Sequence, residues 1–182
     1  MNIPVWYCEK LLDLEISDSL SVDLYDLPSK RLEPVGIDHW INSGKPPDGF
    51  EEFVENSRSI LVVINDAFRP TPTSRILKAL GKSLDLKKST FLVATGLHDS
   101  PDDKSLLKIF ENLLPQIKNR VHSHSAFDNA QLVQFGSGKT MARLNRHIQE
   151  CDSILLIGSV EPHYFAGYTG GRKMILPGCA SF

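Results

Sequence analysis

Residues 59–95, SILVVINDAFRPTPTSRILKALGKSLDLKKSTFLVAT, decide the fold. The runs 59–64 and 90–95 are apolar and rich in β-branched residues, which is typical of strands buried on both faces. Between them, residues 73–84 carry apolar side chains at helical spacing, and a Thr-Ser pair at their start can cap a helix. The stretch therefore predicts a strand–helix–strand unit.

The same alternation continues downstream. Asp102 or Asp103 can cap a second helix, which Pro115 can kink or end. SILLI at 153–157 predicts a third buried strand. Residues 131–135 and 140–144 predict two more strands around a glycine-containing turn.

Upstream, residues 2–8 and 11–16 predict a hairpin, 22–25 a further strand and 48–55 a short helix. The repeated strand–loop–helix pattern indicates an α/β fold. We expect a mostly parallel or mixed sheet flanked by helices, with a small N-terminal β-hairpin region.

Composition excludes several classes of protein. The 182 residues carry 41% hydrophobic and 23% charged residues, which are ordinary globular values and argue against wholesale disorder. The formal net charge of −2 argues against a general nucleic-acid binder. No apolar run approaches the ~20 residues of a membrane-spanning helix. Cys8, Cys151 and Cys179 form no CxxC pair or disulfide framework, which favours a reducing cytoplasm.

Polar side chains follow the carboxyl ends of three predicted strands. Asp66 and Arg69 follow the first, His98 the second, and Glu161 and His163 the third. Ligands of open α/β sheets bind at that edge, so we expect these segments to converge on one crevice.

Three candidate residues, Arg69, His98 and Lys173, have more than one interpretation. Arg69, in a proline-stiffened loop, is suited to grip a carboxylate or phosphate, but an Asp66–Arg69 pair could equally shape the loop. His98 is a candidate general acid–base or a structural histidine. Lys173 can hold an anion, act as a nucleophilic amine, or lie on a flexible surface loop.

Two other motifs favour structural interpretations. Gly136-Ser137-Gly138-Lys139-Thr140 is similar to the end of a P-loop, but position 133 holds Val133 where that motif needs glycine. A glycine-rich hairpin turn is the better prediction, with a P-loop phosphotransferase as the alternative. His122 and His124 alternate along the chain, so they would face opposite sides of a strand. We expect a surface or orienting role for His122, and solvent exposure for His147.

Four motifs in order resemble the N-terminal domain of the nickel-pincer lactate racemase family. They are DAFRPTPT (66–73), ATGLH (94–98), VHSHSAFD (121–128) and EPHYFAGYTGGRKMILPG (161–178). The last is the most specific, and together they span nearly the whole chain.

The resemblance implies a cytoplasmic isomerase, a racemase or epimerase that inverts lactate or a related 2-hydroxy acid by proton-coupled hydride transfer to a nickel-pincer nucleotide. His98 and His163 match the catalytic pair, Arg69 the arginine near the substrate, and Asp66 its loop partner. The family's lysine for cofactor attachment falls on Lys173. The resemblance further implies that a small set of residues lines the cofactor pocket: Ser159, Gly170, Gly171 and Arg172.

The resemblance also implies what lies beyond residues 1–182. We expect them to form the N-terminal catalytic and cofactor-binding domain of a longer two-domain enzyme. The nickel-ligating histidine would lie downstream, so no metal ligand is assigned here, and the fragment alone would be inactive and without cofactor. The implied partners are a small 2-hydroxy acid, the C-terminal domain and cofactor-assembly proteins, with no nucleic acid or membrane.

Two alternatives belong to other classes. One is a related enzyme that acts on another hydroxy acid or sugar acid. The other is a non-catalytic α/β domain that binds an anion or a nucleotide.

Overall fold

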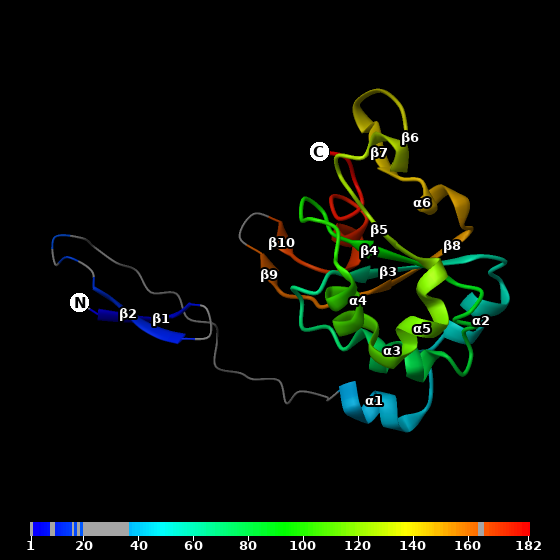
Figure 1. Cartoon of the computed structure of the whole chain (residues 1–182), viewed down its shortest axis with the longest axis horizontal. Helices are drawn as coiled ribbons and strands as arrows, with labels where there is room; N and C mark the ends of the chain where they lie inside the picture. The colour runs from blue at the N-terminus through cyan, green and yellow to red at the C-terminus, as the bar shows by residue number, and fades with distance from the viewer. Residues whose placement is uncertain (1, 8–9, 16, 18, 20–36, 164–165) are drawn as a thin grey trace. The chain divides into compact units, whose positions relative to one another are not determined.

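The computed structural model describes residues 2–7, 10–15, 17, 19, 37–163 and 166–182 (Figure 1). The chain divides into two compact units, residues 1–35 and 36–182, and each is described by itself.

The first unit contains the predicted hairpin. Strand β1 (Asn2–Tyr7) pairs antiparallel with β2 (Lys10–Glu15), and Tyr7 lies opposite Lys10. The expected strand at 22–25 and the residue Cys8 lie outside the described residues.

The second unit is built on a parallel sheet, which confirms the α/β prediction. Within the described residues the sheet has four strands in the order β5-β4-β3-β8, and every neighbouring pair is parallel. Their bounds are Val121–Ser123 for β5, Thr90–Ala94 for β4, Ile60–Asn65 for β3 and Ser153–Ile157 for β8.

The two faces of this sheet pack against different parts of the chain. Because side chains alternate along a strand, Val62 and Ile64 face one side, and they pack with α3, α4 and α5 in the larger core cluster (Figure 1). Leu61 and Val63 face the other side and pack with Met174 and Cys179 from the C-terminal segment. The C-terminal segment is therefore a packed layer of the domain.

The other elements connect or cover this sheet. The helices are α1 (Ile37–Ser43), α2 (Phe50–Glu55), α3 (Thr73–Leu80), α4 (Asp103–Phe110), α5 (Leu114–Ile117) and α6 (His147–Glu150). Two small antiparallel hairpins are β6–β7 (Leu132–Phe135 and Ala142–Asn145) and β9–β10 (Pro162–His163 and Gly167–Tyr168). Among the described residues, no helix has the length and apolar character needed to span a membrane.

The start and end of α3 differ from the prediction. Thr73 and Ser74 are buried within its first turn, and the N-cap is Pro72, whose side chain makes no capping bond. The helix ends at Leu80, four residues earlier than expected, because the chain leaves the helix at Gly81.

Helix α4 begins as predicted. The Asp102 carboxylate accepts a hydrogen bond of 2.8 Å from the backbone N–H of Ser105, which is an N-cap. The helix ends at Phe110, ahead of Pro115, because Glu111 adopts a positive φ of 49°.

Two strands of the sheet depart from the prediction. Strand β8 is an edge strand, so Ser153, Ile154, Leu155 and Leu156 are only half-buried. The sequence around His122 predicts strand β5 only as one possibility. Three residues are too few for a recognisable apolar pattern.

The glycine-rich turn is the predicted hairpin connection. It joins the antiparallel strands β6 and β7, whereas a P-loop joins a strand to a helix. Gly136 has a φ of 73°, and a Cβ there would lie 2.7 Å from the Thr140 carbonyl oxygen. Glycine is therefore required for the turn itself.

Candidate active site

The strand order places a topological switch point at the carboxyl edge of the sheet. From β3 the chain moves to β4 on one side, and later returns to β8 on the other, so the connections after β3 and β8 run apart. Ligands of open α/β sheets bind outside the carboxyl ends of the strands at such a switch point, and we call this edge the crevice. Side-chain contacts join the two loops here, because Asn65 Nδ2 donates to Ser159 Oγ at 3.2 Å.

Close packing holds the base of this crevice in place. The Asn65 amide also donates to Thr71 Oγ1 at 3.1 Å. A Cβ at Gly158 would lie 2.5 Å from Asn65 Oδ1 and 2.6 Å from Met174 Sδ, so only glycine fits. The base is thus built by β3, β8 and the C-terminal segment together.

His98 is paired with Asp66 at the rim of the crevice. Its Nδ1 lies 2.6 Å from Asp66 Oδ2, and the other carboxylate oxygen accepts from the backbone N–H of Phe68 at 3.2 Å. The Asp66 side chain is 10% exposed and that of His98 is 56% exposed. A carboxylate accepts hydrogen bonds, so it favours the tautomer with a proton on Nδ1 and leaves Nε2 as the exposed base.

This pairing corrects the expectation that Asp66 partners Arg69. Arg69 instead donates from its guanidinium to Glu161 Oε2 at 2.9 Å. Both side chains are about one-third exposed, at 33% for Arg69 and 35% for Glu161. The Arg69–Glu161 ion pair therefore bridges the loop after β3 and the loop after β8.

His163 lies in the β9–β10 hairpin on the same side. Its pKa is lowered by partial burial and by the positive charges of Lys173 and Arg69. The backbone N–H of Ala166 donates to its Nδ1 at 3.4 Å. An imidazole that accepts at Nδ1 carries its proton on Nε2, which is the tautomer opposite to that of His98.

Lys173 lies on the 3-10 turn Gly171–Met174. Burial and the nearby Arg69 lower its pKa. The positive charge of Arg69 lowers the pKa of both Lys173 and His163, so charge interactions link these three groups. A lowered pKa gives the amine a larger neutral, nucleophilic fraction at a given pH.

The remaining predicted residues differ in how open they are. A Cβ at Gly170 would lie 2.7 Å from the Ser159 carbonyl oxygen, so the protein itself fills that space. Gly171 has a positive φ of 48°, and no described atom lies within 4 Å of the point that a Cβ would occupy there. Arg172 is exposed. Of the glycine pair, only Gly171 leaves backbone open to a ligand.

The structure thus brings most of the predicted site residues to one sheet edge. Hydrogen bonds or charge interactions connect Asp66 with His98, Arg69 with Glu161, and Arg69 with His163 and Lys173. The sequence placed Glu161 at this edge without giving it a role. Glu161 directly follows a predicted strand, as Arg69 does, and this shared position was the sequence signal for an ion pair between them.

The other predicted histidines lie away from this cluster of contacts. His122 and His147 stack with ring centroids 4.0 Å apart, and the His147 side chain is only 20% exposed, so its predicted solvation is wrong. Glu150 lies 2.6 Å from His147 Nδ1. Among the described residues, no group of three His, Cys, Asp or Glu side chains is placed to hold a metal ion.

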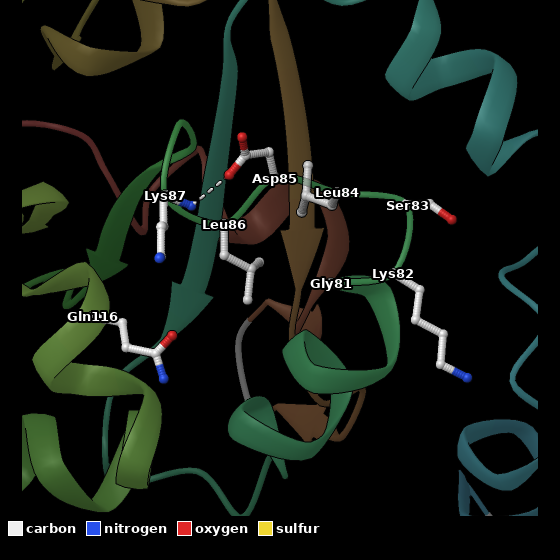
Figure 2. A pocket seen from close by; sticks show the side chains of 8 residues that line it. All are labelled: Gly81, Lys82, Ser83, Leu84, Asp85, Leu86, Lys87 and Gln116. Atoms are coloured by element: carbon white, nitrogen blue, oxygen red, sulfur yellow. Dashed lines mark hydrogen bonds between the residues drawn. The ribbon is translucent and has the colours of Figure 1, made fainter.

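A surface pocket lies at the opposite end of the strands (Figure 2). It is lined by the connection from α3 to β4 together with Gln116, and the Asp85 carboxylate accepts from the backbone N–H of Lys87 at 3.0 Å. Because this connection enters β4 at its amino end, the pocket is separate from the crevice.

Comparison with known proteins identifies the family of this chain. The family model described as the lactate racemase N-terminal domain matches residues 7–182. The chain belongs to this family.

Two curated lactate racemases are similar in sequence. The protein from Thermoanaerobacterium thermosaccharolyticum is 30% identical over 136 residues, which cover 72% of this chain and 32% of that protein. The protein from Lactiplantibacillus plantarum is 31% identical over 143 residues, which cover 74% of this chain and 33% of that protein. The chain thus spans about a third of the length of these curated relatives.

Two solved structures share the fold. The lactate racemase apoprotein from Thermoanaerobacterium thermosaccharolyticum aligns with a TM-score of 0.69 at 23% identity, over 100% of this chain and 44% of that one. A protein from Thermotoga maritima aligns with a TM-score of 0.57 at 24% identity, over 73% of this chain and 37% of that one.

Proposed function

We propose that residues 1–182 form the N-terminal catalytic and cofactor-binding domain of a longer, cytoplasmic racemase or epimerase of a 2-hydroxy acid, lactate or a close relative. The observation that carries the proposal is the presence of two histidines at one sheet edge whose Nδ1 atoms have hydrogen-bond partners of opposite kind. The Asp66 carboxylate at His98 Nδ1 favours an unprotonated Nε2, and the Ala166 N–H at His163 Nδ1 favours a protonated Nε2. Membership of the lactate racemase N-terminal domain family supports the same reaction class.

The opposite tautomers suit a reaction that runs in both directions. One neutral imidazole removes the proton of the substrate hydroxyl and becomes an imidazolium, while the other, in its imidazolium form, returns a proton to the oxygen when the opposite enantiomer forms. General acid–base catalysis works best when the pKa of the group lies near the working pH. A lowered pKa enlarges the neutral fraction of His163 at a given pH, and the neutral ring is the form that acts as a base in the reverse direction.

Arg69 is the candidate grip for the substrate carboxylate. Its guanidinium has five N–H donors, and the bond to Glu161 uses only part of that fork. A bound carboxylate would lie near His163 and Lys173, whose positive charge would stabilise it. The Asp66–His98 pair would then face the hydroxyl end of the same small molecule.

The nickel-pincer nucleotide fits the residues around Lys173. The lowered pKa of Lys173 suits an amine that forms a covalent bond, and Gly171 leaves open backbone beside it. Arg172 is exposed and can pair with a phosphate or carboxylate of the nucleotide. When bound, this group would supply the acceptor for the hydrogen on C2 of the substrate. Cofactor-assembly proteins and the C-terminal domain are the proposed partners.

The experiment uses the full-length protein made together with cofactor-assembly proteins. A single lactate enantiomer is supplied, and formation of the other is followed by chiral chromatography. We expect racemisation, and an added mass on the peptide that carries Lys173. Nucleotide binding without turnover of any hydroxy acid would instead support the non-catalytic binding domain. Turnover of another hydroxy acid or sugar acid alone would support the related enzyme.

A further inference from the structure

The described chain contains one fully buried histidine that the proposed mechanism does not use. His124 directly follows β5 and is 0% exposed. Its backbone is held at the sheet, because its N–H donates to the Val93 carbonyl at 3.0 Å and its carbonyl accepts from Thr95 Oγ1 at 2.8 Å. The backbone of His124 is therefore fixed to β4 and to Thr95, the first residue of the loop that carries His98.

Hydrogen bonds around the ring determine its tautomer. The Asn145 side-chain oxygen accepts from the backbone N–H of His147 at 3.2 Å, so its Nδ2 is the donor. That Nδ2 donates to Gln131 Oε1 at 3.2 Å and approaches His124 Nδ1 at 3.4 Å. His124 Nδ1 is thus an acceptor, and Nε2 carries the proton that it donates to the Ala180 carbonyl at 2.9 Å.

Burial agrees with a neutral ring at this position. Desolvation lowers the pKa of His124, against a smaller opposite effect of the bond to Ala180. A second ring proton would also bring Nδ1–H against the Asn145 amide donor. The neutral ring therefore satisfies both of its neighbours.

Ala180 ends a segment that carries Lys173. The backbone N–H of Gly178 donates to the Lys173 carbonyl at 2.9 Å, and the Gly178 carbonyl accepts from Gly96 at 3.0 Å. Asn145 N–H donates to the Cys179 carbonyl at 2.8 Å. One backbone residue, Gly178, thus connects Lys173 with the loop that leads to His98, and the next two residues are held by Asn145 and His124.

We propose that His124 is a positioning residue whose Nε2–H···O=C bond to Ala180 fastens the 171–180 segment to the sheet and sets the place of Lys173. The idea that Lys173 is positioned for cofactor attachment rests on the proposed function. The claim that the His124–Ala180 bond positions the 171–180 segment does not depend on it. His124 touches neither substrate nor cofactor and acts through the backbone of the segment.

The test compares three variants of the full-length protein without cofactor. His124→Leu removes the donor at similar volume, and His124→Gln keeps an N–H donor. His122→Leu is the matched control, since His122 lies on β5, two residues before His124, and stacks on His147. Brief acylation at a series of pH values, with peptide mass analysis, measures Lys173 against the exposed Lys139.

In the wild type, Lys173 should react at lower pH than Lys139, because its pKa is lowered. His124→Leu should move the half-reaction pH of Lys173 up towards that of Lys139, while His124→Gln and His122→Leu keep the wild-type profile. A folded His124→Leu variant with an unchanged Lys173 profile would overturn the proposal. If the full-length protein had no racemase activity, the proposed function would fail, but the pH profile of Lys173 acylation would still test the role of His124.

A measurement on the wild type keeps the proposal testable if His124→Leu does not fold. Nitrogen-15 NMR of the imidazoles distinguishes the two neutral tautomers. His124 should be neutral at pH 7 with its proton on Nε2. A proton on Nδ1, or a ring that titrates like a solvent-exposed histidine, would remove the Ala180 bond and the proposal with it.

Discussion

Asp66 Oδ2 and His98 Nδ1 lie 2.6 Å apart, although the two residues are 32 positions apart in the chain. They meet because β3 and β4 are parallel neighbours, so the loops after both strands emerge at the same edge. The Phe68 and His98 rings pack in a T-shaped arrangement with ring centroids 5.1 Å apart. The imidazole is therefore oriented by one carboxylate and one aromatic ring, both from the loop after β3.

Asp66→Asn should lower turnover of the full-length enzyme by roughly 10–100-fold, the range seen when a metal-ligating histidine loses its orienting hydrogen-bond partner. An amide can donate to Nδ1 and so favour the tautomer with its proton on Nε2. Initial rates from each enantiomer measure the effect, and Asp128→Asn serves as a control at an exposed aspartate. Wild-type rates in Asp66→Asn would show that the pair is structural only.

Lys173→Gln should raise the pKa of His163. The positive charge of Lys173 is one of the causes that lower that pKa, and its removal favours the protonated imidazolium. Proton NMR titration of the His163 ring in the protein without cofactor measures the shift, with Lys139→Gln as the control. A His163 titration that is identical in both variants would place Lys173 too far away to act on it.

Glu161→Gln should strengthen binding of a small monocarboxylate at Arg69. The exchange removes the charge that competes for the guanidinium, while a neutral amide can still occupy the same space. For a pair that is about one-third exposed, we expect a gain of about 1 kcal/mol at most, or up to about fivefold in Kd. Calorimetric titration with lactate measures it. Weaker binding would mean that Glu161 orients Arg69 for the ligand.

Gly158→Ala should destabilise the domain by about 1–3 kcal/mol, as overpacking of a closely packed site does. The added methyl group would overlap Asn65 Oδ1 and Met174 Sδ. Denaturant unfolding measures the loss. Gly81→Ala is the comparison: a Cβ there lies 3.1 Å or more from its neighbours, so the loss should be smaller. Equal stability of the two variants would contradict the packing described at the crevice.

The sequence predicts the sheet well where strands are long and apolar. β3 and β4 are recognisable because burial on both faces requires a continuous run of apolar residues. β5 has only three residues, and its position in the sheet is determined by its pairing with β4. That pairing cannot be predicted from the local sequence pattern. The end of α3 is not predictable in the same way, because apolar spacing continues to Leu84 after the helix has stopped.

At the candidate site, residue types and their positions after strands were predictable, and the pairs were not. Asp66 is three residues from Arg69, so sequence favours a local pair. The parallel register instead brings Asp66 to His98 and Arg69 to Glu161. The close packing at Gly170 could not be predicted either, because the Ser159 carbonyl oxygen that lies against it comes from another loop.

His98 and His163 are proposed to form an acid–base pair, and single replacements in the full-length, cofactor-loaded enzyme test this pair most directly. His98→Ala and His163→Ala should each lower turnover at least ~10²-fold, the lower range for general acid–base catalysis. Rates are measured from both enantiomers. Since racemisation is one reversible cycle, each replacement should slow both directions and leave the equilibrium constant unchanged. Near wild-type rates in either variant would contradict the pair.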